Sequence, residues 1–385
     1  MSIGVIIVNY FTEDLLRPLV EQVMRSPLVR QLVIFDNGSA ASLSFADSKV
    51  QVIGTGCNLG FAAAVNRAFA ALATDYVLLL NPDLRLDNAC VARLLQASRR
   101  YHCPIVGPRF FWDDERHFRL PPATGELRWL GLGADNPSSL EGRLRAHYWA
   151  IHHDHYWAQD TPFRQPFLSG ACLLLASDWL RARGRVFDER YFMYYEDTDL
   201  CIEAQVEGWV PLCVPAAEAV HYWDQSPEPA GGKAGMMADA SRALRLKYGL
   251  PARDPWSECP LLPQVPGPMP LDLGDLATPP HFILPPWREG TRFEMAIGPG
   301  FVPFAQALVG PGGLQTSGFG DLGRKLTRSA RLWWSGGEEI GLTLPATIWS
   351  RLRPGCYYAR TRQADGSLDR HWQWRRNALT PERRC

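Results

Sequence analysis

The chain has 385 residues, of which 46% are hydrophobic and 21% are charged. This composition is that of a globular protein with room for two domains, and it excludes a disordered chain. Because 40 Lys and Arg residues balance 40 Asp and Glu residues, no net charge attracts nucleic acid, and no nucleic-acid partner is expected.

Met1 leads directly into the apolar stretch 3–8, without a basic leader or a hydrophobic segment of signal-peptide length. The apolar runs at 77–80 and 171–176 are far shorter than the roughly 20 residues of a membrane-spanning helix. The nine cysteines include no C-x-x-C pair, and we expect them to be reduced. These features predict a cytoplasmic protein, with any membrane contact peripheral at the inner face.

Short β-branched runs alternate with helical patterns over the first hundred residues. Strands are predicted at 5–8, 32–35, 50–53, 76–80 and 105–106, and helices over about 15–23, 60–73 and 88–98. This alternation predicts an α/β fold, a mostly parallel sheet flanked by helices. Ligands bind such sheets beyond the carboxyl ends of the strands, where Asn9, Asp36 and residues 81–83 fall.

The next part of the chain is less regular. Residues 112–166 are rich in aromatic residues and histidine and are predicted to form loops over the ligand crevice. Order returns at 167–176, followed by an aromatic strand over 187–195 and a helix over 198–207 that Gly208 ends. We therefore assign residues 1–250 to one domain.

A second domain is predicted at the C-terminal end. Eleven prolines between residues 251 and 286 disfavour a helix or a central strand and predict an extended linker. Hydrophobic alternation at 340–344 and around the Asp365-Gly366 turn predicts that residues 287–385 form a small, all-β, sandwich-like accessory domain. Its candidate roles are acceptor binding, membrane approach and self-association; its basic segment 375–384 can bind anionic lipid or be merely solvated.

Seven segments stand along the chain in the order VIIVNY, DNGS, NLGFAAAVN, LLLNPD, FLSGACLLL, FDERYFMYYEDTDL and AVHYWDQS. In this order and spacing they resemble the rhamnosyltransferase-like branch of the family 2 glycosyltransferases over residues 3–226. The resemblance implies the GT-A fold and an inverting, metal-dependent transfer of a sugar from a nucleotide-sugar donor, such as dTDP-rhamnose or a UDP-sugar. It also implies a glycan or lipid-linked acceptor in cell-surface polysaccharide assembly.

The resemblance further implies a divalent metal, Mn²⁺ or Mg²⁺, held by Asp83 and His221. One or two carboxylates suffice for such an ion because phosphate oxygens and water complete its coordination, and imidazole favours Mn²⁺. Asn81 departs from the two-aspartate form of the motif and is assigned to the donor, as is Asp83. The alternatives to metal binding are that Asn-Pro-Asp only forms a turn and that His221 only packs in the core.

Further donor contacts are implied by the matching segments. These candidates are Asn9, Tyr10, Asp36, Asn58, Gly60 and Asn66. Asp36 would accept hydrogen bonds from the base or ribose, and Gly60 would let the backbone approach the ligand closely. Turn formation explains Asn37 and Gly38 equally well, and Asn58 can be a helix cap.

The segment Tyr195-Glu196-Asp197-Thr198-Asp199 matches the catalytic stretch of the family. We assign Asp197 as the general base that takes the proton of the acceptor hydroxyl. Glu196 and Gly170 are assigned to the acceptor. The structural rival is a helix N-cap, which either Asp197 or Asp199 could be. Because residues two apart on a helix face different ways, we assign Asp199 to capping or to orienting the loop.

Two positions depart from the family pattern: Arg185 precedes Phe187-Asp188 where a double glycine is usual, and Glu203 stands where a basic residue often lies. The leaving diphosphate would then be neutralised differently. The alternative function is a carbohydrate- or nucleotide-binding protein with weakened catalysis on the same fold. Gly208 in place of an arginine favours addition of a single sugar, and the histidines of 147–155 lack the cysteines of a zinc site. The sequence leaves the oligomeric state open.

Overall fold

A computed structural model describes the chain except for residues 41, 124–139, 229–231, 251–269, 299–300, 302–303, 317–338 and 378–385. The internal contacts divide it into two compact units. Of the described residues, unit 1 holds those within 1–109, 122–123 and 159–250, and unit 2 those within 110–121, 140–158 and 270–377. Residues 110–121 and 140–158, expected in the first domain, thus belong to the second unit.

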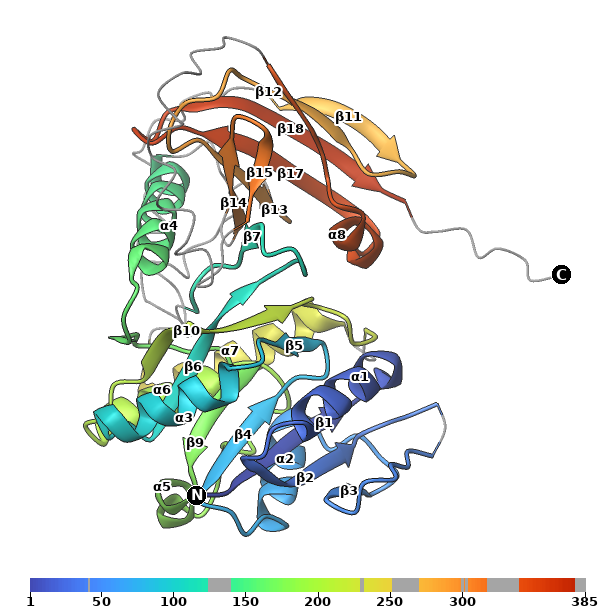
Figure 1. Cartoon of the computed structure of the whole chain (residues 1–385), viewed down its shortest axis with the longest axis vertical. Helices are drawn as coiled ribbons and strands as arrows, with labels where there is room; N and C mark the ends of the chain where they lie inside the picture. Colours follow the sequence, from blue (N-terminus) through green and yellow to red (C-terminus); the bar gives the residue numbers. More distant parts are fainter. Residues whose placement is uncertain are drawn as a thin grey trace, which may run out of the picture. The chain divides into compact units, whose positions relative to one another are not determined.

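Unit 1 is an α/β layer structure (Figure 1). Its strands are β1 (Ile3–Asn9), β2 (Val29–Asp36), β3 (Val50–Gly54), β4 (Tyr76–Leu80), β5 (Leu84–Leu86), β6 (Ile105–Phe111, which runs into unit 2), β8 (Phe163–Arg164), β9 (Cys172–Ala176) and β10 (Leu212–His221). Its helices are α1 (Glu13–Met24), α2 (Phe61–Ala70), α3 (Cys90–Tyr101), α5 (Ser177–Arg183), α6 (Glu196–Val206) and α7 (Lys233–Tyr248).

The strand order in unit 1 is β3-β2-β1-β4-β9-β6. Strands β3, β2, β1 and β4 are parallel, and β9 runs antiparallel between β4 and β6. All seven residues of β1 are buried, as expected for a central strand covered on both faces. The predicted α/β fold, a mostly parallel sheet flanked by helices, is confirmed.

The chain leaves β1 toward β2 but returns from β3 to β4 on the other side of β1. Right-handed crossovers in opposite directions place α1 and α2 on opposite faces of the sheet. The carboxyl ends of β1 and β4 therefore border a topological switch point, the usual ligand position in such sheets.

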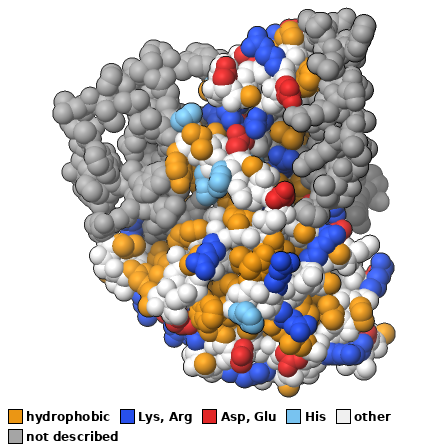
Figure 2. Space-filling model, turned by 60° about the vertical axis from the view of Figure 1, so that its left-hand side comes forward, with side chains coloured by type: hydrophobic (Ala, Val, Ile, Leu, Met, Phe, Trp, Pro, Cys, Tyr) orange, Lys and Arg blue, Asp and Glu red, His pale blue; other side chains and the backbone are white. Residues whose placement is uncertain are grey.

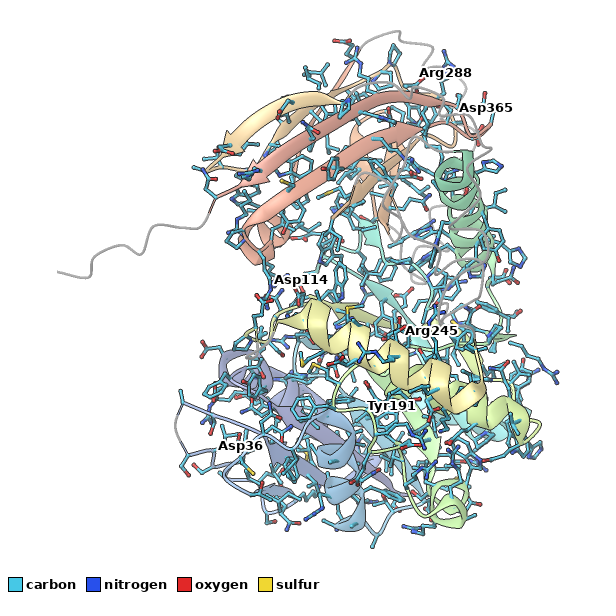
Figure 3. All side chains as sticks on the ribbon, turned by 180° about the vertical axis from the view of Figure 1, so that it is seen from behind. Asp36, Asp114, Tyr191, Arg245, Arg288 and Asp365 are labelled. Carbon is cyan, nitrogen blue, oxygen red and sulfur yellow. The ribbon has the colours of Figure 1, made fainter. Side chains whose placement is uncertain are left out.

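One predicted strand of unit 1 is wrong. Residues 187–195 form turns and bends rather than an aromatic strand. Tyr191 is buried and packs with Ala240 and Leu244 of α7, so its aromatic character serves helix packing; Figure 3 shows Tyr191 beside that helix. Tyr194 and Tyr195 have left-handed φ values of 71° and 65°, which no extended strand contains.

Unit 2 is largely β structure. Its strands are β7 (Phe118–Arg119), β11 (Leu271–Leu276), β12 (His281–Leu284), β13 (Arg292–Ala296), β14 (Phe304–Gly310), β15 (Gly313–Gln315), β16 (Ile340–Thr343), β17 (Gly355–Arg362) and β18 (Leu368–Arg376). The order is β11-β18-β17-β13-β14-β7, with β12 and β16 forming a second, two-stranded sheet. The predicted hairpin at Asp365-Gly366 joins β17 and β18 and is visible at the Asp365 label of Figure 3.

Strands β11 and β12 lie in the segment predicted as a linker. Among the described residues of that segment, prolines 270, 279, 280, 285 and 286 flank the two strands and none lies within them. Residues 251–269 lie outside the described part of the chain. The prolines therefore lie at the ends of these strands, and their number made the whole segment resemble a linker in the sequence.

The aromatic segment predicted as loops contains helix α4 (Leu140–Ala158); α4 and the short helix α8 (Ala346–Arg351) both belong to unit 2. Trp149, His153 and Tyr156 are buried at helical spacing. Asp154 accepts hydrogen bonds from Arg292 and Arg362 of the unit 2 sheet. Burial lowers the pKa of His153 to about 3, so this imidazole is a neutral core group.

The core of unit 2 is aromatic. Phe282, Phe293, Trp372 and Trp374 are at most 3% exposed, and Phe282 lies 5.0–5.5 Å from the other three rings. These tryptophans fill a core rather than present a surface to sugar rings. Within the part of the chain that the structure describes, no helix combines the length and apolar character needed to cross a membrane.

Candidate active site

A pocket of about 280 Å³ lies in unit 1 at the switch point. Its lining includes Val8 and Tyr10 at the end of β1 and residues 81–83, which directly follow β4. The predicted site residues that line it are Tyr10, Asn58, Gly60, Asn81, Asp83, Gly170, Glu196, Asp197 and His221. Asn9, Asp36 and Asn66 do not line it. Residues as distant in sequence as Tyr10 and His221 thus meet in one cavity.

Asp83 and His221 are brought together by strand pairing. Leu84, the first residue of β5, pairs with His221, the last residue of β10. As a result Nε2 of His221 lies 3.4 Å from Oδ1 of Asp83, and the two residues are 9% and 6% exposed. The backbone carbonyl of Asp83 also accepts the N–H of Tyr222 at 3.1 Å.

The electrostatics of Asp83 favour the carboxylate. Burial opposes ionisation, but the adjacent His221 and the surrounding backbone N–H groups together outweigh it, and the pKa of Asp83 lies below its ordinary value. Cis ligands of one ion with bonds near 2.1 Å are separated by about 3 Å, so a nitrogen and an oxygen 3.4 Å apart fit a shared divalent cation. Asn81, held by its N–H to the Ala171 carbonyl, lines the pocket beside them.

Glu196 and Asp197 are the first two residues of helix α6, and both line the pocket. The left-handed residues Tyr194 and Tyr195 turn the chain directly into the helix. Oδ2 of Asp197 accepts the backbone N–H of Gly170 at 2.8 Å, and Oδ1 accepts the N–H of Thr198 at 2.7 Å. Both oxygens of Asp197 are thereby fixed in direction.

Burial is the main cause that raises the pKa values of both carboxyls. The pKa of Glu196 reaches about 8, with the Asp197 charge as the second cause. Burial also raises the pKa of Asp197, but hydrogen bonds from Gly170 and Thr198 oppose this rise because they stabilise the charged form. We therefore assign the negative charge of the pair to Asp197 and the proton to Glu196, whose Oε2 has no hydrogen-bond partner among the described residues.

The glycine at position 60 is required by the protein itself. Its φ is +84°, and a Cβ there would lie 2.5 Å from the carbonyl oxygen of Phe192. That carbonyl accepts the N–H of Phe61 at 2.6 Å. The close backbone approach that the sequence suggested is thus to residue 192. Asn58 accepts the Gly60 N–H in a local turn.

Asn37, attributed to turn geometry, also lines the pocket. Its amide accepts the N–H of Leu59 and donates to the carbonyl of Gly60, both at 3.0 Å. Sequence reasoning missed this residue because Asn-Gly is a common turn pair. Its position directly after β2, next to Asp36, was the feature of the sequence that could have indicated a place at the ligand site.

Asp36 and Asn9 bind each other beside the pocket. The Asn9 amide donates to Oδ1 of Asp36 at 3.2 Å and to the Gly38 carbonyl at 3.0 Å, and Asn9 is fully buried. Ser39 donates to the other Asp36 oxygen at 2.6 Å. Asp36 is half-buried at the end of β2 (Figure 3). Asn9 therefore orients Asp36, and a direct donor contact for Asn9 has no support in this geometry.

Asn66 holds a loop instead of facing the pocket. Its side-chain oxygen accepts the N–H groups of Val186 and Phe187 at 3.0 Å, and its amide donates to the Phe187 carbonyl at 2.9 Å. This fully used side chain fixes the start of the 187–195 segment that leads to Glu196. Asn66 thus positions this loop, and its contact with the donor stays a prediction.

The two departures from the family pattern compensate each other. Arg185 donates to Glu203 at 2.8 Å, so the unexpected arginine and the unexpected glutamate form an ion pair. Asp188, Asp199 and Glu203 lie close enough together to hold a metal, but Nζ of Lys247 contacts all three at 2.7–3.0 Å. Asp199 thereby serves this cluster rather than a helix cap.

Comparison with known sequences agrees with this geometry. Residues 4–170 match the family model described as Glycosyl transferase family 2. N-acetylglucosaminyl-diphospho-decaprenol L-rhamnosyltransferase of Mycobacterium tuberculosis (strain ATCC 25618 / H37Rv) is 30% identical over 219 residues, covering 50% of this chain and 66% of the relative. Rhamnosyltransferase WbbL of Escherichia coli (strain K12) is 24% identical over 237 residues, covering 57% and 82%. The chain therefore spans just under two thirds of the mycobacterial relative.

Among solved structures, GalNAc-T7 with UDP, GalNAc and Mn²⁺ overlaps 63% of this chain and 48% of its own, with 15% identity and a TM-score of 0.47. At that level of overlap the likeness says nothing about the ligand of the present chain. The family match covers the pocket residues from Val8 to Gly170. Together with the rhamnosyltransferase relatives, it shows that this chain resembles the proteins of glycosyl transferase family 2, and among them the rhamnosyltransferases.

Proposed function

We propose that this protein transfers a single sugar from a nucleoside diphosphate sugar to an acceptor hydroxyl, with inversion at the sugar carbon. The observation that carries the proposal is one pocket lined both by Asp83 and His221 and by Glu196 and Asp197. The first pair suits a diphosphate-bound cation, and the second suits removal of a proton from a hydroxyl.

Asp83 and His221 would hold Mn²⁺ or Mg²⁺. When bound, such an ion acts as a Lewis acid that neutralises charge on the donor diphosphate. The 3.4 Å separation of the two ligand atoms and their burial support this assignment. Asn81, Tyr10 and Asn58 line the same pocket and are proposed donor contacts. Asp36, oriented by Asn9 next to it, is proposed to accept a hydrogen bond from the nucleoside.

Asp197 is the proposed general base. The acceptor oxygen forms its bond to the sugar carbon while the bond from that carbon to the diphosphate oxygen breaks, and the hydroxyl proton passes to the Asp197 carboxylate. The hydrogen bonds from Gly170 and Thr198 hold this carboxylate in place. Glu196, protonated at neutral pH because its pKa is about 8, can donate a hydrogen bond to an acceptor oxygen.

The rhamnosyltransferase relatives favour dTDP-rhamnose as donor, with a UDP-sugar as the alternative. The name of the mycobacterial relative specifies a lipid-linked sugar acceptor, and we propose a glycan or lipid-linked acceptor here as well. A lipid-linked acceptor would bring a cytoplasmic enzyme to the inner membrane face. On the face shown in Figure 2, Lys and Arg side chains are scattered among apolar ones.

The alternative, a binding protein with weakened catalysis, loses one of its two arguments. Glu203, which stands where a basic residue is usual, is ion-paired with Arg185 and Lys247. Its charge is therefore balanced inside the fold and does not reach the pocket lining. Asn81 alone remains in favour of the alternative.

A donor panel tests the proposal. The purified protein is incubated with Mn²⁺ and dTDP-rhamnose, UDP-sugars or GDP-mannose, and slow donor hydrolysis is followed alongside donor binding. One donor should be turned over, and Asp197→Asn should bind it but lose at least about a hundredfold in turnover. The exposed Asp47→Asn serves as the matched control. Donor binding without turnover, unchanged by Asp197→Asn, would favour the binding protein.

A further inference from the structure

The pocket contains a cation that no sequence motif marks. Lys233 is the one Lys or Arg side chain among the described residues that line it. It is the first residue of helix α7, and its side chain is 19% exposed. Its ammonium group donates to Oδ1 of Asp224 and, at 3.2 Å, to the carbonyl of Ser226.

Lys233 is connected to the predicted metal ligand through a single loop. The backbone N–H of Tyr222, where this loop begins, donates to the Asp83 carbonyl at 3.1 Å, and Asp224 and Ser226 further along the loop both bind Lys233. Asp83, Asp224, Ser226 and Lys233 all line the pocket. The ammonium group therefore lies on the same part of the pocket lining as the carboxylate proposed to hold the metal.

The conformation of this loop is unusual. Trp223 and Asp224 both have left-handed φ values, 53° and 59°. Backbone strain of this kind is often found at ligand sites. The two bonds from Lys233 help to keep the loop in this conformation.

One divalent ion balances the two negative charges of a nucleoside diphosphate sugar, but the nucleoside diphosphate that leaves carries a further negative charge. Arg185, which stands where the family usually has a double glycine, does not line the pocket and is ion-paired with Glu203. Lys233 in contrast lies in the pocket, and its partner Asp224 is 39% exposed, so that this carboxylate can turn to water. An ammonium group carries three donors and binds phosphate as a point charge.

We propose that Lys233 binds the diphosphate of the donor, exchanging the Asp224 carboxylate for a phosphate oxygen. This inference rests on the proposed function. When the sugar–phosphate bond breaks, its electron pair passes to the diphosphate, and Lys233 meets the charge gained there. Asp224 then has a role of its own: it competes with the diphosphate for the same ammonium group.

Calorimetric titration with Mn²⁺ tests the exchange. UDP, dTDP and GDP are titrated into the wild-type protein, and for the diphosphate that binds most tightly the matching nucleoside is measured by competition. Lys233→Met should weaken diphosphate binding by about tenfold and leave nucleoside binding unchanged. Lys233→Arg should retain most of the affinity, and the exposed Lys49→Met controls for loss of a lysine charge elsewhere.

Asp224→Asn separates ligand binding from loop support. If Lys233 binds the diphosphate, removing its competitor should keep or tighten diphosphate binding, whereas a lysine that only holds the loop would make both variants weaken it equally. Equal weakening, or wild-type affinity in Lys233→Met, overturns the proposal while the proposed function stands. Wild-type protein that binds none of the three diphosphates would overturn both.

Discussion

The backbone N–H of Gly170 donates a 2.8 Å hydrogen bond to Oδ2 of Asp197, and a Cβ at position 170 would lie 3.1 Å from the Cβ of Asp197. Gly170 was expected to face the acceptor. The structure gives it a second role, because its N–H orients the proposed base and its missing side chain leaves room for that carboxylate. Its function is therefore tied to having no side chain.

Gly170→Ala should displace the Asp197 carboxylate without unfolding the protein. Because a misplaced catalytic group loses much of its advantage, donor turnover should fall by about tenfold or more, while the melting temperature changes little. Gly235→Ala on α7 is the matched control, since no atom lies within 4 Å of its added Cβ. Undiminished turnover in Gly170→Ala would contradict the positioning of Asp197 by this contact.

Glu196 should make stability depend on pH. Its ordinary pKa of 4.5 rises to about 8 in the fold, so between these values the folded state keeps a proton that the unfolded chain has lost. The free energy of unfolding then falls as pH rises through this window, by on the order of a few kcal/mol in total.

Glu196→Gln removes this titration and should flatten the pH dependence. Denaturant unfolding at pH 5, 6, 7 and 8 measures it, with the exposed Glu21→Gln as control. The variant should gain stability relative to the wild type as pH rises. A constant difference across the four pH values would show that Glu196 does not hold a proton in the fold.

Asp83 and His221 should account for metal binding. Asp83→Asn and His221→Ala should each weaken Mn²⁺ binding by at least about tenfold, measured by electron paramagnetic resonance in the presence of a nucleoside diphosphate. Asp188→Asn is the control, because its carboxylate already faces Lys247 at 3.0 Å. Loss of Mn²⁺ binding in the control alone would move the metal to the Asp188, Asp199 and Glu203 cluster.

Lys247 should be a major determinant of stability. Its ammonium group contacts Asp188, Asp199 and Glu203, and the side chain of Asp199 is only 1% exposed. Lys247→Met leaves these carboxylates close together without their shared cation, which should cost about 3 kcal/mol of unfolding free energy. Chemical denaturation measures the loss against Lys49→Met; equal stability of the two variants would show that water or another group replaces Lys247.

The sequence by itself determined the α/β fold of unit 1. Strand runs such as 76–80 are continuous and apolar because both faces of a central strand are covered. The ends of these strands could then be predicted from the sequence, and Asp83, which follows the strand 76–80, was therefore predicted at the ligand site. The match of several segments to one family added His221, Glu196 and Asp197, which spacing alone could not connect.

Helix α4 was not recognised, although its buried residues have helical spacing. Trp149, His153 and Tyr156 carry a polar atom each, so hydropathy does not separate them from the exposed His147 and His155. Burial against the sheet of unit 2 decides which of these aromatic residues are core. That information lies in distant parts of the chain, because His153 contacts the Arg119 carbonyl and the neighbouring Asp154 pairs with Arg292 and Arg362.

Side-chain pairing was decided only by the tertiary structure. Arg185, Glu203 and Lys247 looked like separate anomalies or ordinary charges, yet they share one cluster. Asn66 and Gly60 matched a donor-facing segment, but their partners are in the 186–192 loop. Hydrogen bonds and ion pairs act over a few ångströms, and folding alone determines which distant residues come within that range.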